Sequence, residues 1–519
     1  MLRLVVAGAQ AGPDALLASA RAGRVPVDDV RAAATGASAA DALRAAAADG
    51  ADAGLVAADL VVHASLLGDV LDDPRRPLAA LVLDDGRLGA LRLDAASAGV
   101  VADLLPAPAD AGPDAVLSAV LDALTKAGLP VARVTPGRLV ALRPAPGERD
   151  AAVAALAATD ERTARLDGAA RPGDGFYSTF VLRRLSRLAT GVAVRLGATP
   201  NAVTLTSLAI GLAGAALLVS PAVAPRGLGA LLLQVSIVVD CVDGELARYS
   251  RSFSALGAWL DGVSDRVKEY AVLAALAVAA GGRTGWLLAV AGLAVMTYRH
   301  VADHHFTVRL AATAPPAAPG LAPAVAVPRE TASVWLRRVL QLPVGERTLL
   351  VSVLAAVAGP LPTLAAFAGA AAASAVWTTG GRVLRSRALP GSVLGRLGWL
   401  RPALRLVAEA AVVAAVFAWR APDRVWLGYA LLAVVAYHAY DTVYRAKHRV
   451  AGPPAAVRVA ALGSEGRAAV VVVAAVAGGT ALTAVTAVLV VAFGALFGGE
   501  SLDAWLRWLR GRPSIEEER

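Results

Sequence analysis

Apolar residues follow two different patterns along the chain. Over residues 1–170, short β-like runs such as Leu2–Ala7 and Leu78–Leu83 alternate with Ala-rich stretches such as Asp114–Ala127. Short apolar strands separated by helices predict an α/β unit with a mainly parallel sheet. No run in this part reaches the roughly 18 apolar residues that a membrane span needs. We therefore expect a soluble α/β domain over residues 1–170.

From about residue 199, the apolar segments become long enough to cross a membrane. Eight separate segments cover residues 202–222, 227–247, 256–280, 284–308, 346–360, 362–380, 403–419 and 425–444. A ninth, 467–498, is long enough for a hairpin and is broken near Gly478. These segments predict a polytopic α-helical membrane protein. We expect a six-helix core in residues 199–390 and two to four further spans in residues 391–519.

A basic segment in residues 171–198 joins the two parts. Phe176–Gly197 places Arg183, Arg184, Arg187 and Arg195 among apolar residues. This pattern favours a juxtamembrane amphipathic helix in the headgroup plane. An ordinary amphipathic linker helix is the alternative.

Composition supports the membrane interpretation. The 519 residues are 57% hydrophobic and 18% charged, with one cysteine, which excludes a disordered chain and a disulfide scaffold. Residues 1–170 hold 22 acidic and 16 basic side chains, and the remaining residues hold 19 and 34. In a membrane protein, surplus arginine marks cytoplasmic loops and contacts with anionic lipid. Because no basic run is interleaved with aromatic residues, we expect no nucleic-acid partner.

Four aspartates interrupt the second and third predicted spans: Asp240, Asp243, Asp261 and Asp265. The first two lie three residues apart and the last two lie four apart, so each pair shares one helix face. Two antiparallel helices would bring four carboxylates together, and these would repel each other without cations. Carboxylate ligands favour Mg²⁺, Mn²⁺ or Ca²⁺ over zinc. The pattern therefore predicts a divalent-metal site inside the membrane domain.

Other side chains that bind metals fit less well. Cys241 lies between the aspartates but off their face, and we interpret it as helix filler. His300, His304 and His305 offer three ligands without a fourth, so a zinc site there is disfavoured.

The order D-x2-D-G-x2-A-R-x8-G-x3-D-x3-D resembles the signature of the CDP-alcohol phosphotransferases. It is complete here in Asp240, Asp243, Gly244, Ala247, Arg248, Gly257, Asp261 and Asp265. The resemblance implies that the four aspartates hold two Mg²⁺ or Mn²⁺ ions, which grip the diphosphate of a CDP-linked donor. It also implies that Asp265 is the general base for the acceptor hydroxyl and that Arg248 balances charge. Gly244, Ala247 and Gly257 would let the nucleotide approach the helices.

The entry to the first span resembles the T-P-N-x-x-T motif of the same family. It reads Thr199-Pro200-Asn201, with Thr204 one turn further on. The resemblance implies that Asn201 and Thr204 lie near the nucleotide. Helix capping alone is the alternative.

Two arginines near predicted span ends are candidates for binding the acceptor. Arg299 and Arg347 would suit an anionic acceptor such as an inositol phosphate or glycerol phosphate. The alternative is that both are positive-inside anchors. Two donor types fit the family: CDP-diacylglycerol and a CDP-polar alcohol such as CDP-inositol.

The layout resembles fusions of an inositol-phosphate cytidylyltransferase with a di-inositol-phosphate phosphate synthase. The N-terminal VVAGAQAGPDAL lacks their G-G-x-G-T-R-type loop, so we expect a degenerate nucleotidyltransferase-like domain with a regulatory or structural role. We expect a homodimer in the inner (plasma) membrane, with this domain and the active site facing the cytoplasm. A non-catalytic membrane scaffold or transporter is the alternative from another class.

Overall fold

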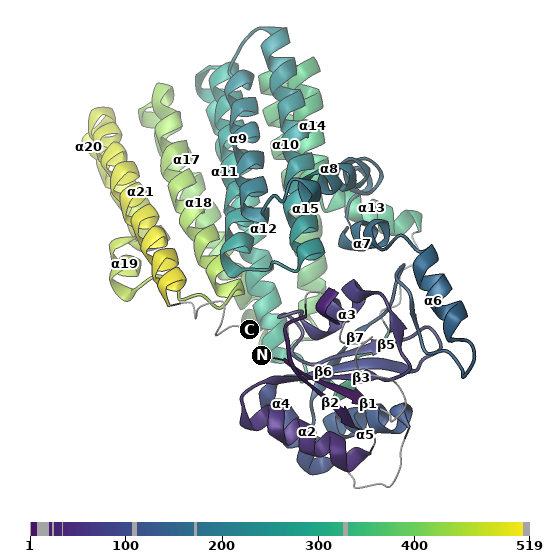
Figure 1. The fold of residues 1–519 in the computed structure, drawn as a ribbon. Helices are drawn as coiled ribbons and strands as arrows, with labels where there is room; N and C mark the ends of the chain where they lie inside the picture. The colour runs from purple at the N-terminus through teal and green to yellow at the C-terminus, as the bar shows by residue number, and fades with distance from the viewer. Residues whose placement is uncertain are drawn as a thin grey trace.

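The structure, a computed structural model, describes residues 2–7, 20–22, 25–33, 35–105, 112–170, 174–324 and 331–511. It has two parts, an α/β domain and a bundle of long helices (Figure 1). The predicted fold class, a polytopic helical membrane protein with a soluble N-terminal α/β domain, is confirmed. Most of the VVAGAQAGPDAL segment, on which the degenerate-loop prediction rests, lies outside the described residues.

A seven-stranded sheet forms the centre of the soluble domain, in the order β2-β1-β3-β6-β5-β7-β9. The strands are β1 (Leu2–Ala7), β2 (Val27–Ala33), β3 (Asp52–Ala57), β5 (Ala79–Val82), β6 (Leu88–Leu93), β7 (Pro130–Val134) and β9 (Gly320–Leu321), with β4 (Val61–Val62) and β8 (Ala141–Leu142) paired separately. Four of the six pairings in the large sheet are parallel, and β6 is antiparallel to both neighbours. The sheet is thus mainly parallel, with one antiparallel strand that arises from a tight β5–β6 hairpin turn at Asp85-Gly86.

Helices cover both sides of this sheet and lead from it to the bundle (Figure 1). They are α2 (Gly36–Ala48), α3 (Ala64–Leu71), α4 (Ala95–Leu104), α5 (Pro113–Lys126), α6 (Arg149–Ala158) and α7 (Glu161–Ala169). The buried apolar residues of the strands and of α2 to α5 form one continuous core. The soluble domain therefore has its own hydrophobic core, separate from that of the bundle.

The last strand of the sheet comes from the membrane domain. β9 lies in the connector after the fourth long helix, and it pairs in parallel with β7. The amide of Gly320 donates to the carbonyl of Leu129 at 2.9 Å, and the amide of Ala322 donates to Val131 at 2.8 Å. The Pro-rich connector thus ties the two parts of the chain together, which the sequence did not indicate.

All nine predicted apolar segments are helical. The long helices are α9 (Pro200–Leu218), α10 (Val223–Ser250), α11 (Ala255–Ala280), α12 (Gly282–Thr313), α14 (Val344–Val357), α15 (Pro360–Ser386), α17 (Arg401–Arg420), α18 (Val425–Lys447), α20 (Gly463–Ala477) and α21 (Gly479–Arg510), with short α13 (Ala332–Leu340), α16 (Val393–Arg396) and α19 (Ala455–Ala460). The predicted break of the last segment falls at Gly478, whose φ is 125°. Among the described residues, seven helices are long and apolar enough to span a membrane, or eight if α13 and α14, bent by 67°, form one span.

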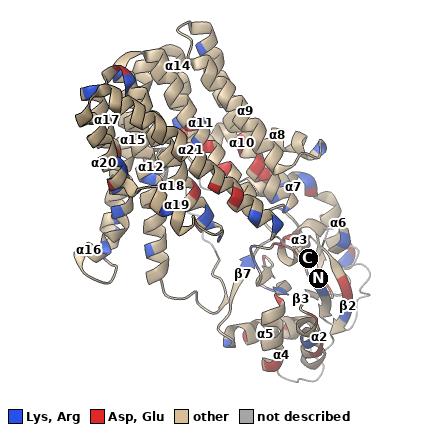
Figure 2. Ribbon diagram, turned by 90° about the vertical axis from the view of Figure 1, so that its left-hand side faces the viewer, with Lys and Arg blue, Asp and Glu red and all other residues tan. Residues whose placement is uncertain are grey.

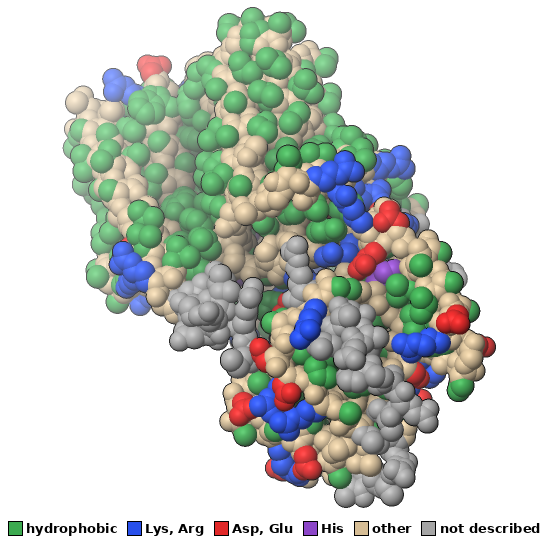
Figure 3. Space-filling model, viewed as in Figure 1, with side chains coloured by type: hydrophobic (Ala, Val, Ile, Leu, Met, Phe, Trp, Pro, Cys, Tyr) green, Lys and Arg blue, Asp and Glu red, His purple; other side chains and the backbone are tan. Residues whose placement is uncertain are grey.

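The outer surface of the bundle is apolar. At most half of the residues in the apolar window of each candidate span are buried inside the protein. Figure 3 shows hydrophobic side chains over the sides of the bundle and charged side chains on the soluble domain and the junction. A surface of this kind suits contact with lipid.

The predicted juxtamembrane helix is present as α8 (Arg183–Arg195), preceded by one π-helical turn over Ser178–Leu182. Leu185, Leu188 and Val192 form a stripe of side chains that are 48%, 73% and 52% exposed. The opposite side of the helix packs on α10, where Arg183 forms an ion pair with Glu245 at 3.0 Å and Ser186 and Thr190 donate to the same carboxylate. The helix is therefore amphipathic as predicted, and its place at the lipid surface stays a prediction.

Candidate functional site

The α10–α11 hairpin places all four motif aspartates at one level of the bundle. α10 ends at Arg251, which takes a left-handed conformation with a φ of 57° and reverses the chain. α11 begins at the N-cap Ser254, whose Oγ accepts a hydrogen bond from the amide of Gly257 at 2.9 Å. Because this turn is short and defined, Asp240 of α10 and Asp261 of α11 come to face each other.

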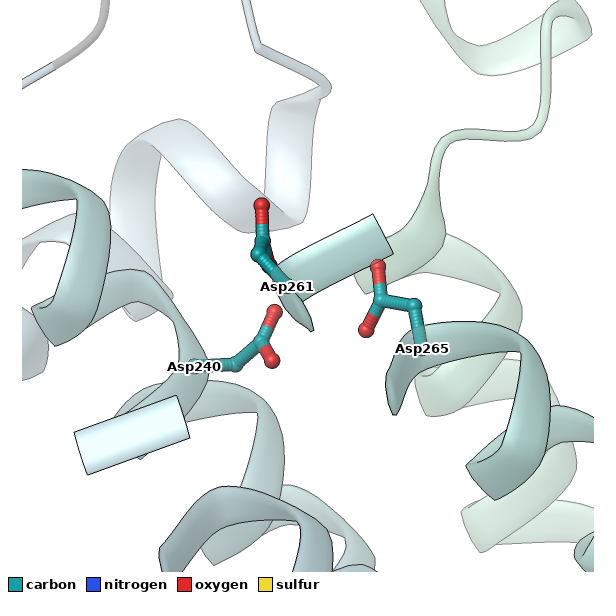
Figure 4. Close-up of side chains that lie close together, drawn as sticks. All are labelled: Asp240, Asp261 and Asp265. Atoms are coloured by element: carbon teal, nitrogen blue, oxygen red, sulfur yellow. The ribbon is translucent and has the colours of Figure 1, made fainter. Parts of the chain in front are cut away.

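Three of the four carboxylates converge. Oxygen atoms of Asp240, Asp261 and Asp265 all lie within 4.8 Å of one another (Figure 4). Asp243 is buried beside them, and its Oδ2 accepts a hydrogen bond from Thr204 Oγ1 at 2.5 Å. The structure thus brings together the predicted aspartate set, with Asp243 turned towards α9.

A lysine ammonium occupies the centre of the cluster. Lys268 Nζ lies 2.6 Å from Asp240 Oδ1, 3.1 Å from Asp265 Oδ1 and 3.0 Å from Ser207 Oγ. Ser207 Oγ also donates to Asp240 at 3.2 Å. Arg266 lies 3.8 Å from Asp265 but is shared with Glu269, so these cations do not neutralise the four carboxylates and the cluster keeps an excess of negative charge.

The donor set fits a hard divalent cation. Mg²⁺ binds carboxylate oxygens at about 2.0–2.1 Å, so opposite ligands lie about 4.2 Å apart. The convergence of three oxygens within 4.8 Å requires only a small closure to reach that geometry. Asp240 and Asp265 already bind one positive group, the ammonium of Lys268.

Asn201 and Thr204 face this hairpin from α9. Thr199 is the N-cap of α9, because its side chain accepts from the amide of Ala202 at 3.4 Å, and Pro200 is the first helical residue. Asn201 Oδ1 lies 2.9 Å from the position that a Cβ would take at Gly257. Only glycine at that position lets the two helices approach with Asn201 between them. Capping therefore accounts for Thr199, whereas Asn201 and Thr204 contact the aspartate-bearing helices.

Arg248 extends from α10 towards the soluble domain. Its Nε donates to the carbonyl of Ala169 at the end of α7. Its guanidinium also lies over Gly244, 3.3 Å from the position of a Cβ there. Ala247 is half-buried on the same helix. The motif arginine thus links the hairpin to the soluble domain, a contact that the sequence did not indicate.

Arg347 and Arg299 lie in different surroundings. Arg347 is buried, and its Nε lies 3.3 Å from Glu269 Oε1. Both residues line a cavity of about 70 Å³ together with Asp265, Arg266 and Lys268. Arg299 donates to the carbonyl of Gln341 at 2.6 Å and is absent from this lining. Of the two predicted acceptor arginines, the structure brings Arg347 to the aspartates.

The remaining candidates form no metal site within the described parts of the chain. The ring of His300 stacks on Tyr440 with centroids 4.2 Å apart, and His304 and His305 contact each other. The Asp240–Asp261–Asp265 cluster is the group of potential ligands found there. Cys241 is a free thiol of intermediate exposure.

Sequence reasoning missed several buried charges next to the motif, among them Lys268 and Glu245. Lys268 follows Asp265 by three residues on the same face of α11, and a charge at that spacing inside an apolar segment was an available signal. Glu245, within the motif, is fully buried and accepts hydrogen bonds from Ser186 at 2.6 Å and Thr190 at 2.7 Å. Its role in holding α8 against α10 depends on tertiary contacts that spacing does not reveal.

Comparisons with known proteins divide residues 198–519 at the connector. Residues 198–328 match the family of CDP-alcohol phosphatidyltransferases, and residues 329–519 match a family of unknown function, DUF5941. The first match covers α9 to α12 and the whole aspartate motif, and the second covers α13 to α21.

Curated relatives share the same description, "Bifunctional IPC transferase and DIPP synthase". The protein of Aquifex aeolicus is 38% identical over 108 residues, which are 20% of this chain and 24% of that protein. The protein of Thermococcus kodakarensis is 35% identical over 131 residues, which are 24% and 29%. The chain matches about a quarter of the length of these relatives. The match over residues 198–328 confirms the predicted resemblance to the CDP-alcohol phosphotransferase family.

Proposed function

We propose that the chain is a membrane-bound CDP-alcohol phosphotransferase, which transfers a phospho-alcohol group from a CDP-linked donor to an acceptor hydroxyl and releases CMP. The observation that carries the proposal is the convergence of Asp240, Asp261 and Asp265 on the hairpin of a matching domain. A charged cluster of this kind inside apolar helices requires a partner that neutralises it. A non-catalytic scaffold would have no need for the complete motif.

Asp240, Asp261 and Asp265 would hold Mg²⁺ or Mn²⁺, and Asp243 would join them on leaving Thr204. Two bound ions would neutralise charge on the donor diphosphate and on the leaving CMP. Lys268 would have to give up its contacts with Asp240 and Asp265 when the site is filled.

Asp265 is the proposed general base. Its carboxylate lines the cavity that also contains Arg347, so it lies on the side from which an acceptor would approach. It would take the proton of the acceptor hydroxyl, whose oxygen forms the new bond to phosphorus as the bond to CMP breaks. Asn201, Gly244, Ala247 and Gly257 would border the nucleotide.

We propose an inositol-linked substrate pair. The relatives named above support this choice over CDP-diacylglycerol, which the family also allows. Arg347 would bind the phosphate of an inositol phosphate or glycerol phosphate acceptor, because its buried guanidinium is a fixed fork of donors. Arg299 would assist from α12, where it already reaches the turn before α14.

The distribution of charge supports a cytoplasmic position for the soluble domain and the active site. The helix ends that face away from the soluble domain carry few charges: Arg226, Arg283, Arg420, Asp423 and Arg424. Basic residues are concentrated at the opposite ends, near the α/β domain (Figure 2). By the positive-inside rule, this side faces the cytoplasm of an inner (plasma) membrane.

The decisive experiment measures CMP release by the full-length protein in nanodiscs with Mg²⁺. CDP-inositol and CDP-diacylglycerol are each paired with inositol phosphate, glycerol phosphate and inositol. We expect release with CDP-inositol and not with CDP-diacylglycerol, and no release from Asp240→Asn. Absence of CMP with every pair, from protein that unfolds cooperatively, would leave the scaffold or transporter alternative in place. Mass photometry of the same sample tests the proposed homodimer.

A further inference from the structure

A second polar cavity lies between the soluble domain and the α10–α11 turn. Its volume is about 640 Å³, which is within the range of small-molecule sites. Its walls are α3, the segment after β7, α7 and residues 248–253 of the hairpin. The converging aspartates do not line it, whereas the motif residue Arg248 does.

Arginine dominates the walls of this cavity. Eight arginine and three aspartate side chains line it, a surplus of five positive charges. Asp73 is shared between Arg75, at 2.7 Å, and Arg76, at 3.8 Å. Asp167 is likewise shared between Arg138 and Arg187. Each of these carboxylates forms ion pairs with two guanidinium groups. Each set of one carboxylate and two guanidinium groups therefore keeps a net positive charge.

Two more of the arginines are hydrogen-bonded to uncharged carbonyls. Arg133 Nε donates to Ala322 at 2.9 Å, and Arg165 donates to the carbonyl of Tyr249. Arg165 also lies over the ring of Tyr249, with its guanidinium carbon 4.2 Å from the centroid. Backbone and ring contacts of this kind fix a guanidinium without neutralising it. The positive charge of Arg133 and Arg165 therefore remains available to a ligand.

The arginines of the cavity lower the pKa of one carboxyl group on its wall, that of Asp73. Burial opposes ionisation of Asp73, yet the hydrogen bonds and charge of Arg75 hold its pKa below the usual value. Guanidinium groups arranged around a water-filled space suit the oxygen atoms of a phosphate, which they bind through paired N–H donors.

The same cavity contacts the hairpin that carries the aspartates. Arg251, in the hairpin turn, donates to the carbonyl of Ser65 and lies 3.2 Å from Asp69, both on α3. Its guanidinium rests on Gly68, where a Cβ would lie 2.4 Å from Nη1. Arg75 lies over the ring of Phe253, 3.6 Å from its centroid. A ligand in this cavity would therefore touch both the soluble domain and the turn between the aspartate-bearing helices.

We propose that this cavity binds a phosphate-bearing anion, a phosphomonoester or a diphosphate, at the junction of the two domains. The site shares no aspartate with the proposed transferase site, and Arg248 of the motif borders it. Charged side chains outnumber apolar ones in the lining, which favours a water-soluble ligand over an acyl chain. A lipid headgroup that carries a phosphomonoester has the same recognition chemistry and is separated from a soluble anion by the test.

The test measures inorganic pyrophosphate binding to the full-length protein in nanodiscs of uncharged lipid, in the presence of EDTA. Chelation of divalent ions removes binding that would depend on the aspartate cluster. We expect saturable binding that is weakened about tenfold or more by Arg76→Ala and by Arg138→Ala, because each loses a charge-assisted contact. These side chains are 39% and 74% exposed, so their removal should leave the fold intact.

Arg31→Ala is the matched control. Arg31 is 48% exposed, pairs with Asp29 on β2 at the far edge of the sheet, and should bind pyrophosphate like the wild type. A second arm adds phosphatidic acid to the nanodiscs. Displacement of pyrophosphate by this lipid, lost in Arg76→Ala, would assign the site to a headgroup. Absence of saturable binding in both arms, or equal binding by the cavity variants and Arg31→Ala, overturns the proposal.

Discussion

Two groups of buried charges in the helical bundle differ in their balance. In the C-terminal helices, Arg467 forms two hydrogen bonds with Glu409, at 2.6 and 2.7 Å, and the two charges cancel. At the α10–α11 hairpin, Lys268 contacts Asp240 and Asp265, and two further carboxylates lie beside them, so negative charge remains. Both groups are expensive to bury, but only the second needs something from outside the chain.

The difference teaches how to separate a structural ion pair from a binding site within apolar helices. A closed pair such as Arg467–Glu409 satisfies its own hydrogen bonds and can be replaced by apolar residues of similar size. An unbalanced cluster needs further stabilisation. Around Arg445, which pairs with both Asp441 and Glu500, hydrogen bonds to Asp441 from Trp259 and Ser501 supply it. At the hairpin, a bound cation would supply it. The balance of charge is therefore more informative than the number of charged residues.

The largest effect is expected from the ligand aspartates. Asp240→Asn or Asp261→Asn should reduce CMP release by more than about 10³-fold, since bound metal supplies several kcal/mol of transition-state stabilisation. Normal expression and an unchanged unfolding temperature would show that the fold survives. More than a tenth of wild-type activity in both variants would contradict the metal site.

Asp265→Asn should separate chemistry from binding. We expect a loss of about 10²–10⁴-fold in single-turnover rate, because an amide cannot accept the acceptor proton. Donor affinity, measured by calorimetry with Mg²⁺, should fall less than in Asp240→Asn. If both variants bind the donor equally poorly, Asp265 is only a ligand and the base lies elsewhere.

Breaking the Arg467–Glu409 ion pair should reduce stability and leave activity unchanged. Glu409→Ala leaves Arg467 buried without a carboxylate partner and should cost about 3–5 kcal/mol of stability. CMP release per folded molecule should stay at the wild-type level. The double variant Glu409→Leu/Arg467→Met should recover stability, and a persistent defect in it would show that the pair does more than fill the core.

Lys268→Met tests how the charge balance of the hairpin cluster controls metal binding. The ammonium contacts Asp240 and Asp265, so its removal should tighten Mn²⁺ binding roughly tenfold, a change of about 1.4 kcal/mol. Electron paramagnetic resonance of free Mn²⁺ measures the affinity without any turnover. Lys126→Met, on the surface helix α5, is the matched control. Weaker Mn²⁺ binding in Lys268→Met would mean that the lysine supports the site.

The smallest effect concerns the arginine-lined cavity. The pKa of Asp73 is lowered, so its contribution to stability is complete above the unfolded-state value of about 3.9 and is lost as the pH falls. Asp73→Asn should therefore make thermal stability less sensitive to acidification between pH 6 and 3. Burial raises the pKa of Asp69, so Asp69→Asn should make that sensitivity greater. Equal slopes in both variants would refute these assignments.

The helices and the aspartate cluster could be predicted because their signals are local. Long apolar runs fix the membrane helices, and the spacing of Asp240, Asp243, Asp261 and Asp265 fixes their faces. The break at Gly478 was also a local signal, because glycine tolerates the positive φ found there.

Features that depend on distant partners could not be predicted. The Glu245 carboxylate accepts hydrogen bonds from α8, and Arg248 donates to the end of α7. Neither contact follows from a periodic pattern in the sequence. The antiparallel β6 had a local signal in Asp85-Gly86, which the sequence reading overlooked. β9 had none, because two residues of a Pro-rich connector form a strand only when the edge of β7 is present.

That edge strand has a consequence for biogenesis. Residues 135–319, which include four membrane helices, separate β7 from its partner. At a synthesis rate of about 5–20 residues per second, the ribosome needs roughly 10–40 s to reach β9 after β7 has emerged. Throughout that interval the nascent α/β domain carries an open sheet edge, which other chains can pair with. Synthesis of α9 to α12 must therefore precede completion of the sheet, which makes the order of assembly part of the fold.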